Sequence, residues 1–480
     1  PEFSDGDIIS IAFDCGEFIA VVDNNSFTFA SELADILSNE KNEKITCDAK
    51  QLYSWAFMRD VRIKGKVSDI MIAGYILNPS ANDYSPVRMA QEYGALCPEI
   101  SEENETALKA AALKGAWEKV IKQIEENDQL PLLYDIEMPL SKVLSSMEVT
   151  GFLVDRESIQ QYGAVLEEKI NSMVSEIYDL AGEEFNINSP KQLGTILFEK
   201  LGLPAKKKTK SGYSTNADVL EGLAPDYPIV SLILEYRTLA KLKSTYCDGL
   251  QKCIAPDGRI HSTLNQTETK TGRISSTEPN LQNIPVRTPV GRELRKFFIA
   301  KEGCVLVDAD YSQIELRVLS DIANDETMIS AFNNGDDIHT ITASQVFNMP
   351  VEAVTPLMRS RAKAVNFGIV YGIGAFSLAH DIGVTRAEAD KYIKGYLHHF
   401  SGVDSYMKNV IAKAKEDGYV QTLFKRRRYL PELAASNAII RNFGERVARN
   451  MPIQGTAADI IKIAMVRVYD RLEKENLKSK

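Results

Sequence analysis

The chain has 480 residues, of which 44% are hydrophobic and 25% are charged, a composition typical of a globular protein with several domains. No apolar run is long enough for a membrane-spanning helix, and the first residues lack the basic-then-apolar pattern of a secretion signal. The six cysteines are scattered and form no C-x-x-C pair, so we expect no zinc site and a reducing, cytoplasmic location.

The net charge of −10 is unevenly distributed, which weakens its argument against a nucleic-acid-binding protein. Residues 1–130 contain 23 acidic and 12 basic side chains, a net of −11, whereas the remainder has a net charge of +1. Because phosphate binding depends on local charge, a nearly neutral remainder can still contain basic grooves.

Residues 1–130 predict a small α/β domain. Short apolar runs in residues 7–22 predict two strands joined by a turn, and residues 69–77 predict a buried helix. The Ala-rich, charged stretch from Glu99 to Asp128 has helical spacing.

The next segment predicts a pair of long helices. Apolar residues recur on one helical face from Ser158 to Leu180, and a second helix near Val230–Leu250 contains the basic residues Arg237 and Lys241. The basic loop that contains Lys206–Lys208 lies between them, so a protruding helical pair with a lysine tip is expected.

The apolar run Gly303–Asp310 predicts a buried strand that places carboxylates at its end. Asp310 can hold Mg²⁺ there while phosphates supply other ligands, or it can cap the following helix. Asp308 would share a strand face with Asp310, either as a second carboxylate of a pair or as a solvated edge residue.

Residues 312–450 predict mostly helix, and four side chains there form one helical stripe. Arg359, Lys363, Phe367 and Tyr371 are four residues apart, and twelve residues of helix span ~18 Å. Two cations followed by two aromatic rings suit a nucleoside triphosphate lying along the helix. The alternative is an amphipathic helix with both rings in the core.

Three further features complete the pattern. His339 lies upstream of this stripe, and a lone histidine is more often a structural donor than a ligand. Thr271–Pro285 is rich in amide and hydroxyl side chains and predicts a loop that hydrogen-bonds a partner. Arg446–Ile461 has small residues after Gly455, which predict close helix packing.

Four segments are similar to the signature stretches of family A DNA polymerases: Thr271–Pro285, Asp310–Arg317, Arg359–Gly372 and Arg446–Ile461. The match runs from about Leu130 to Lys480. The chain resembles in particular the large, Klenow-type fragment of bacterial DNA polymerase I, Bacillus-like with a degenerate exonuclease domain. The resemblance implies an α/β (α+β) fold class in which an exonuclease-like α/β domain precedes a right-hand polymerase with palm, thumb and fingers.

The resemblance also implies boundaries for these parts. We expect the exonuclease-like domain at 1–130, the base of palm and thumb at 131–165, the thumb at 166–255, the palm with the first catalytic aspartate at 256–320, the fingers at 321–445 and a palm helix at 446–480.

Site residues transfer from the family position by position. The implied catalytic residues are Asp310 and Lys363, and the implied ligands of two Mg²⁺ ions include Asp310 and the carbonyl of Tyr311. The implied nucleotide contacts are Gln313, Glu315, His339, Arg359, Lys363, Phe367 and Tyr371. The implied DNA contacts are Arg237, Lys241, Arg273, Asn280, Gln282, Asn283, Arg446, Asn450 and Gln454.

Several roles follow from this transfer. Lys363 is placed to protonate the pyrophosphate leaving group, and Glu315 to crowd the sugar 2′ position. Phe367 implies poor acceptance of dideoxynucleotides. Arg273 and Gln454 are donors suited to the acceptor that every base pair presents in the minor groove.

The implied function is that of a monomeric DNA-directed DNA polymerase in replication and repair, with primer–template DNA and dNTPs as partners and no membrane. The family's second palm carboxylate is expected just after Lys480, so the alternative is a polymerase fragment that binds primer–template DNA without catalysis. A single-subunit phage-type RNA polymerase is a third possibility, which Glu315 disfavours because a ribonucleotide enzyme leaves room at the 2′ position.

The N-terminal domain departs from the exonuclease pattern. Asp14-Cys15-Gly16 stands where an Asp-x-Glu is expected, Leu52 stands where a second acid belongs, and 101–120 lacks a Tyr-x-x-x-Asp. Since paired acids are needed to hold the metal ions of such a site, we expect no proofreading.

Overall fold

The computed structural model describes residues 1–4, 6–96, 104–205, 208–209, 212–285 and 289–480. The chain forms two compact units. The first contains residues 1–149, 264–275 and 309–480, and the second contains 150–263 and 276–308. This coarse division leaves the finer domain boundaries as predictions.

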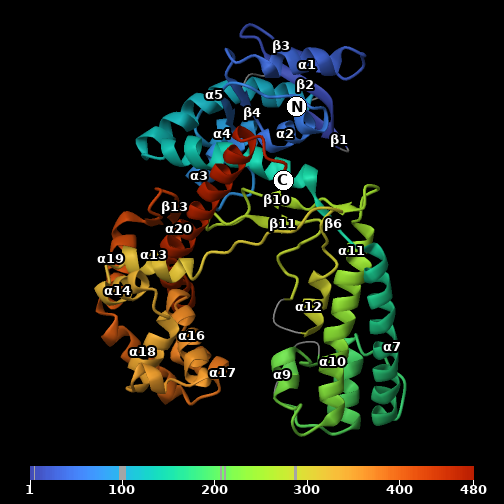
Figure 1. Ribbon diagram of the computed structural model, residues 1–480, viewed down its shortest axis with the longest axis vertical. Helices are drawn as coiled ribbons and strands as arrows, with labels where there is room; N and C mark the ends of the chain where they lie inside the picture. Colours follow the sequence, from blue (N-terminus) through green and yellow to red (C-terminus); the bar gives the residue numbers. More distant parts are fainter. Residues whose placement is uncertain (5, 97–103, 206–207, 210–211, 286–288) are drawn as a thin grey trace. The chain divides into compact units, whose positions relative to one another are not determined.

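The N-terminal part of the first unit is the expected small α/β domain (Figure 1). Its strands are β1 (Glu2–Ser4), β2 (Asp7–Asp14) and β3 (Ile19–Asp23) in one antiparallel sheet, and β4 (Lys44–Thr46) parallel to β5 (Val67–Asp69). Its helices are α1 (Phe29–Ser38), α2 (Ala49–Met58), α3 (Ile70–Leu77), α4 (Pro86–Glu92) and α5 (Glu105–Glu126). The two strands expected within 7–22 and the helix expected at 69–77 are confirmed.

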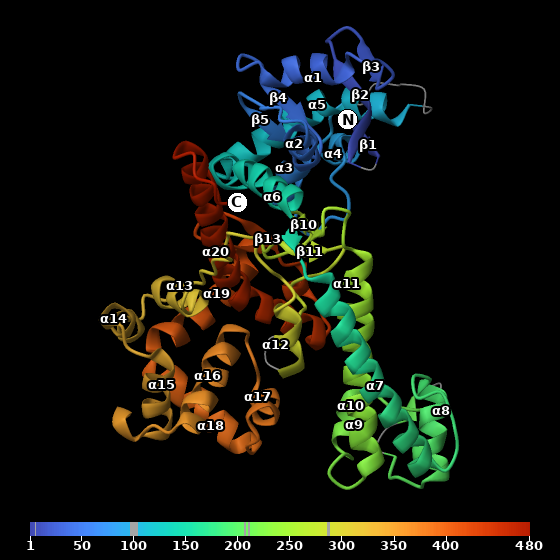
Figure 2. The same ribbon diagram turned by 45° about the vertical axis from the view of Figure 1, so that its right-hand side comes forward.

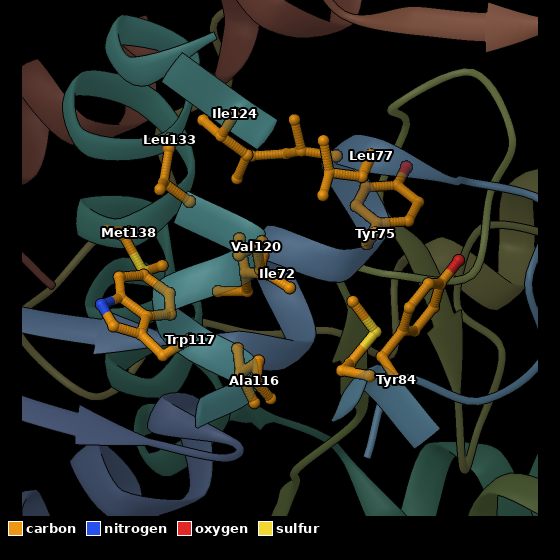
Figure 3. Close-up of a cluster of buried hydrophobic side chains, with 14 of the residues drawn as sticks. Ile72, Tyr75, Leu77, Tyr84, Ala116, Trp117, Val120, Ile124, Leu133 and Met138 are labelled. Atoms are coloured by element: carbon orange, nitrogen blue, oxygen red, sulfur yellow. The ribbon is translucent and has the colours of Figure 1, made fainter. Parts of the chain in front are cut away.

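The core of this part is built around α3 and α5 (Figure 3). Tyr75 of α3 and Val120 of α5 are fully buried, and Trp117 packs in the same cluster. The chain continues through a π-helical segment η1 (Leu132–Glu137) into α6 (Met138–Thr150), whose side chains pack on the helix that ends the unit.

The C-terminal part of the first unit is mostly helical, as predicted. Its elements are α13 (Ile314–Ile322), α14 (Glu326–Asn334), α15 (Ile338–Phe347), the 3-10 helix η4 (Val351–Ala353), α16 (Pro356–Val370), α17 (Ala375–Ile382), α18 (Arg386–His399), α19 (Ser401–Asp417), the antiparallel pair β12 (Tyr419–Gln421) and β13 (Arg427–Tyr429), the 3-10 helix η5 (Pro431–Ala434) and α20 (Ala438–Lys474). Leu319, Ile369 and Ile453 place α13, α16 and α20 around one core.

The second unit contains the predicted helical pair, α7 (Arg156–Ala181) and α10 (Pro228–Leu242), which lie side by side in both views (Figures 1 and 2). Its other helical elements are α8 (Pro190–Gly194), the π-helical η2 (Thr195–Lys200), α9 (Ala217–Glu221), the π-helical η3 (Lys243–Asp248), α11 (Gly249–Lys252) and α12 (Pro289–Arg295). Its strands pair as β6 (Phe152–Leu153) with β9 (Arg259–Ile260) and β7 (Lys208–Thr209) with β8 (Gly212–Tyr213). Two more strands, β10 (Thr263–Asn265) and β11 (Ser275–Thr277), pair with each other and contain two of the four points where the chain passes between the units.

The buried strand expected at Gly303–Asp310 is wrong. The segment has no regular secondary structure, and Val305 and Val307 are 80% and 86% exposed. A β-strand needs a hydrogen-bonded neighbour, and within the part of the chain that the structure describes no strand pairs with this segment. Its apolar pattern is therefore strand-like while its conformation is not.

Candidate nucleotide and nucleic-acid site

The predicted stripe on α16 faces away from the core. The helix begins at Pro356, where the Thr355 side chain accepts a hydrogen bond from the Met358 amide at 3.3 Å. Ala362, Val365 and Ile369 form its buried face, which turns the stripe outward. Lys363 is exposed, Phe367 is half-buried and Tyr371 is 42% exposed. The alternative with both rings in the core is therefore wrong.

The cationic end of the stripe contains one paired and one exposed cation. Arg359 Nε donates to Asp337 Oδ2 at 2.6 Å, and both side chains are partly exposed. Burial alone would raise the pKa of Asp337, but the hydrogen bond from Arg359 and the amides of α15 outweigh it and lower that pKa. Lys363 lies one turn further along, 5.9 Å from the ring of Phe367.

His339 is a structural partner of this helix in the observed conformation. It is 2% exposed, and its Nδ1 lies 3.0 Å from Nδ2 of Asn366. Burial lowers the pKa of His339 to about 4, and the charges of Arg359 and Lys363 add to this effect. The neutral ring therefore supports α16 from behind.

Glu315 connects three segments that lie far apart in the sequence. It lies in the first turn of α13 with its side chain 10% exposed, and it accepts hydrogen bonds from Arg273 and from the Tyr371 hydroxyl, the latter at 3.0 Å. Burial and the carboxylate raise the pKa of Tyr371. The arrangement fixes Glu315 as a rigid acidic wall beside the exposed stripe.

Gln313 lies at the N-terminal cap position of α13, two residues before Glu315. It adopts a left-handed backbone conformation with φ of 55° at the cap position, and its Oε1 is a buried atom with no hydrogen-bond partner among the described residues. Asp310 is therefore not the cap of α13, because Gln313 holds that position.

Helix α20 contains the predicted segment Arg446–Ile461 and lies against the end of the stripe. A Cβ added to Gly372 would lie 3.3 Å from Cγ of Arg446, so the end of the stripe packs on this helix. Arg446 is exposed, Asn450 is half-buried with an unpartnered buried Oδ1 within the described chain, and Gln454 is 8% exposed. These three residues are four apart and form one helical face.

The close packing predicted after Gly455 is confirmed. A Cβ added to Gly455 would lie 2.6 Å from Cγ2 of Thr422 and 3.1 Å from the carbonyl oxygen of Thr271. Only glycine allows this approach, so the loop that contains Arg273 lies directly on α20.

The candidate metal ligands are sparse. Asp310 is exposed and lies in the irregular segment before α13, followed by Tyr311. Within the described residues no group of three His, Cys, Asp or Glu side chains could hold an ion. A carboxylate and a carbonyl are hard oxygen donors, which suit Mg²⁺ bound jointly with phosphates rather than in a protein cage.

Some of the predicted DNA contacts in the second unit are exposed, and others are hydrogen-bonded within the protein. Asn280, Gln282 and Asn283 are exposed, and Asn280 Oδ1 accepts from the amides of the other two residues at 3.0 and 3.2 Å. Lys241 is exposed on α10, whereas Arg237 donates to the Thr215 carbonyl at 2.5 Å. Lys206 and Lys207 of the predicted tip lie outside the described residues, and the side chain of Lys208 does too.

The exonuclease-like part lacks paired acids at the expected positions. Asp14 is exposed at the end of β2, and Leu52 is 3% exposed in the hydrophobic core. Asp69 is buried, and its carboxylate accepts from the amides of Ala49 and Met71 at 2.6 and 2.8 Å. Asp69 caps α3, and although these amide hydrogen bonds lower its pKa, burial and the charge of Asp48 outweigh them and raise it to about 7.

Sequence reasoning missed a buried group of four charges, Glu137, Arg426, Asp459 and Lys462, none more than 1% exposed. Arg426 lies in a run of basic residues that is typical of a solvated patch, and Lys462 lies in an apolar stretch of α20. A lysine and an aspartate three residues apart on an otherwise apolar helix face were the available signal.

No helix of the described chain has the length and apolarity to cross a membrane.

Comparisons with known proteins agree with these observations. Residues 156–480 match the sequence model described as DNA polymerase family A, and residues 2–104 match the one described as DNA polymerase I, ribonuclease H-like domain. The chain is 47% identical over 438 residues to DNA polymerase I of Caldicellulosiruptor bescii, covering 91% of this chain and 52% of that protein. It is 46% identical over 464 residues to DNA polymerase I of Bacillus subtilis, covering 92% and 53%.

Among solved structures, the chain is similar to the POL domain of Pol1 from M. smegmatis in complex with DNA primer-template and dNTP. The TM-score is 0.89 at 36% identity, and the match covers 98% of this chain and 83% of that one. The chain spans about half the length of the curated relatives it matches.

Proposed function

The chain belongs to DNA polymerase family A, and from this premise we propose that it binds primer–template DNA and adds deoxynucleotides to the primer 3′-hydroxyl as the template directs, in replication and repair. The observation that carries the proposal is the outward-facing stripe of Arg359, Lys363 and Tyr371, which ends at the buried Glu315. The M. smegmatis relative bound to primer-template and dNTP supports it.

The cations of α16 are proposed to hold the triphosphate. Arg359 and Lys363 lie one turn apart, so both can contact phosphate oxygens of one nucleotide. Lys363 is proposed to donate a proton to the pyrophosphate leaving group. We extend the nucleotide contacts to Gln313, Phe367 and His339, of which His339 would have to become exposed first.

Glu315 is proposed to exclude ribonucleotides. Two hydrogen bonds hold its carboxylate against Arg273 and Tyr371, so the side chain cannot easily swing away from an added 2′-hydroxyl. A fixed carboxylate thus acts through shape and through loss of solvation of the extra hydroxyl.

Duplex binding is proposed to use the polar side chains on both units. Those on the first unit are Arg273, Arg446, Asn450 and Gln454, and those on the second are Arg237, Lys241, Asn280, Gln282 and Asn283. Donors on Arg273 and Gln454 match the acceptors common to all base pairs in the minor groove, which allows binding without sequence preference.

Asp310 and the Tyr311 carbonyl are proposed to hold Mg²⁺ together with the triphosphate. The chemistry that two Mg²⁺ ions supply when bound is activation of the primer 3′-hydroxyl and neutralisation of charge on the triphosphate. The chain's own residues position the nucleotide and supply the proton at Lys363.

The domain boundaries given above are carried into this proposal, with 1–130 as a degenerate exonuclease-like domain. The second candidate function is DNA binding without catalysis. The favouring observation is the sparse carboxylate content around Asp310 among the described residues.

Primer extension by this chain on a recessed DNA duplex with dNTPs and Mg²⁺, beside a binding measurement on the same DNA, tests the proposal. We expect extension that Asp310→Asn abolishes, while Asp321→Asn, an exposed aspartate of α13, serves as the control and should leave extension unchanged. Tight binding without extension would favour the binding-only function. Absence of both binding and extension would contradict both candidates.

A further inference from the structure

The buried charges of the first unit form one continuous network. Arg426 donates to Asp459 Oδ1 from Nε at 2.9 Å and from Nη2 at 2.7 Å, and its Nη2 also contacts Glu137. Lys462 Nζ donates to Glu137 Oε1 at 2.7 Å. Two acids and two bases cancel in charge, so the network joins η1, the β12–β13 turn and α20 without a net buried charge.

The network also holds the loop that precedes Arg273. Gln266 Nε2 donates to the Glu137 carbonyl at 2.8 Å at one end of the loop. At the other end Gly272 has φ of +88°, and a Cβ there would lie 2.5 Å from Nε of Arg426. The Arg426 guanidinium therefore fills the space directly beneath the backbone of Gly272.

Contacts around Thr269 hold the same loop, residues 266–273, and we call the whole set of contacts on this loop the clamp. The Tyr75 hydroxyl, from the core in Figure 3, donates to the Thr269 carbonyl at 2.6 Å, and Thr269 Oγ1 donates to the Arg273 carbonyl at 2.6 Å. The carbonyl of Thr271 faces Gly455 of α20. The loop is thus fixed from the exonuclease-like part, from the network and from α20.

Arg426 acts on both partners of the proposed minor-groove contact at once. It bonds Asp459, which lies five residues beyond Gln454 on α20, and it supports Gly272, which precedes Arg273. Arg273 itself is 49% exposed at its side chain, so the loop presents it to a ligand.

We infer that Arg426 is a positioning residue that fixes the spacing between Arg273 and the Asn450–Gln454 face of α20, so that both can follow the minor groove of the primer–template duplex. This inference rests on the proposed function. It gives the exonuclease-like part a role in DNA binding through Tyr75, because the hydroxyl of Tyr75 holds the same loop.

The test combines hydrogen–deuterium exchange of the loop amides with the dissociation constant for a recessed primer–template, measured by fluorescence anisotropy. Arg426→Lys keeps the charge but loses the two-pronged bond to Asp459. It should speed exchange at 266–273 and weaken DNA binding about fivefold, whereas in an Arg273→Ala background it should change binding less than about twofold. Arg428→Lys, a buried arginine in β13 whose charge interacts with Glu432, is the matched control.

Tyr75→Phe is the milder variant, since it removes one hydroxyl and keeps the ring in the core. It should also speed exchange in the loop and weaken DNA binding about twofold. If Arg426→Lys does not fold, Tyr75→Phe with and without Arg273→Ala decides.

Unchanged loop exchange would overturn the inference while leaving the proposed function standing. Equal losses of affinity with and without Arg273 would also overturn it, because they would show a contribution to stability alone. If the unaltered chain failed to bind primer–template DNA, the proposed function would fall and the DNA-positioning role with it, and the exchange data would still report on the clamp.

Discussion

Glu315 is the residue on which nucleotide selection depends in our proposal. Its carboxylate is held by Arg273 and Tyr371, and we predict that Glu315→Ala opens the space that it occupies. The ratio of ribonucleotide to deoxynucleotide incorporation in primer extension should rise by ~30-fold, the effect of about 2 kcal/mol at one rejected hydroxyl. Glu326→Ala, an exposed acid at the start of α14, is the control, and an unchanged ratio in Glu315→Ala would remove the assignment.

His339 predicts a pH dependence of stability. Its folded pKa of about 4 lies below the ordinary value, so the unfolded chain binds the proton more readily. The stabilising effect of the neutral ring is complete above about pH 6.5 and is lost as the pH falls toward 4.

Between pH 7 and pH 5 the free energy of unfolding should therefore fall by about 1–2 kcal/mol more in the unaltered chain than in His339→Gln. Urea unfolding at both pH values measures this difference. His398→Gln changes an exposed histidine of α18, and its free energy of unfolding should decrease by the same amount as that of the unaltered chain. Equal decreases in all three proteins would refute the buried neutral state of His339.

At the scale of single elements, α16 separates chemistry from affinity. We predict that Lys363→Ala raises the activation free energy of the chemical step by ~2–4 kcal/mol, because a preorganised cation beside a developing negative charge is lost. Single-turnover kinetics should show this loss with little change in DNA affinity. Lys413→Ala, an exposed lysine of α19, should change neither quantity, and equal losses of rate and affinity in Lys363→Ala would identify a DNA contact instead.

The elements of the exonuclease-like part predict no removal of mismatched 3′ ends. Leu52 is core and Asp69 caps a helix, so neither offers a metal ligand beside Asp14. A primer with a mismatched 3′ end should stay intact with Mg²⁺ and without dNTPs. Degradation that Asp14→Ala abolishes would show that an active site exists there.

At the scale of the whole first unit, the buried charge network is a stability determinant. Lys462→Met leaves Glu137 with one cation fewer, and we expect a loss of about 3–5 kcal/mol in the free energy of unfolding. Denaturant unfolding measures it, with Lys474→Met on the exposed end of α20 as the control, expected within about 0.5 kcal/mol. A loss no larger than the control's would mean that the network contributes nothing to stability.

The network also has a pH signature. Burial alone would raise the pKa of Glu137, but Lys462 and Arg426 outweigh it and hold that pKa at about 2. Since the folded pKa is depressed, the stability gained from Glu137 is present above about pH 4.3 and is lost as the pH falls toward 2.

Much of this organisation was predictable from local patterns. The two strands at 7–22, the helix at 69–77, the long helical pair and the stripe on α16 follow from period-2 and period-3.6 spacing, because these periods act over a few residues. Close packing at Gly455 was also predictable, since the absence of a Cβ is a property of the residue itself. The family match accounts for the order of the motifs.

Tertiary structure alone decided the rest. An apolar run such as 303–310 becomes a strand only when a neighbour bonds its backbone, and no spacing rule supplies that neighbour. His339 and Glu315 look alike as polar residues near helix starts, yet one is buried behind α16 and the other forms the wall of the site. Glu137, Arg426 and Lys462 come together across about 290 to 325 residues of sequence. Sequence spacing does not show which of such distant charges will pair, because they become partners only when folding buries them together away from water.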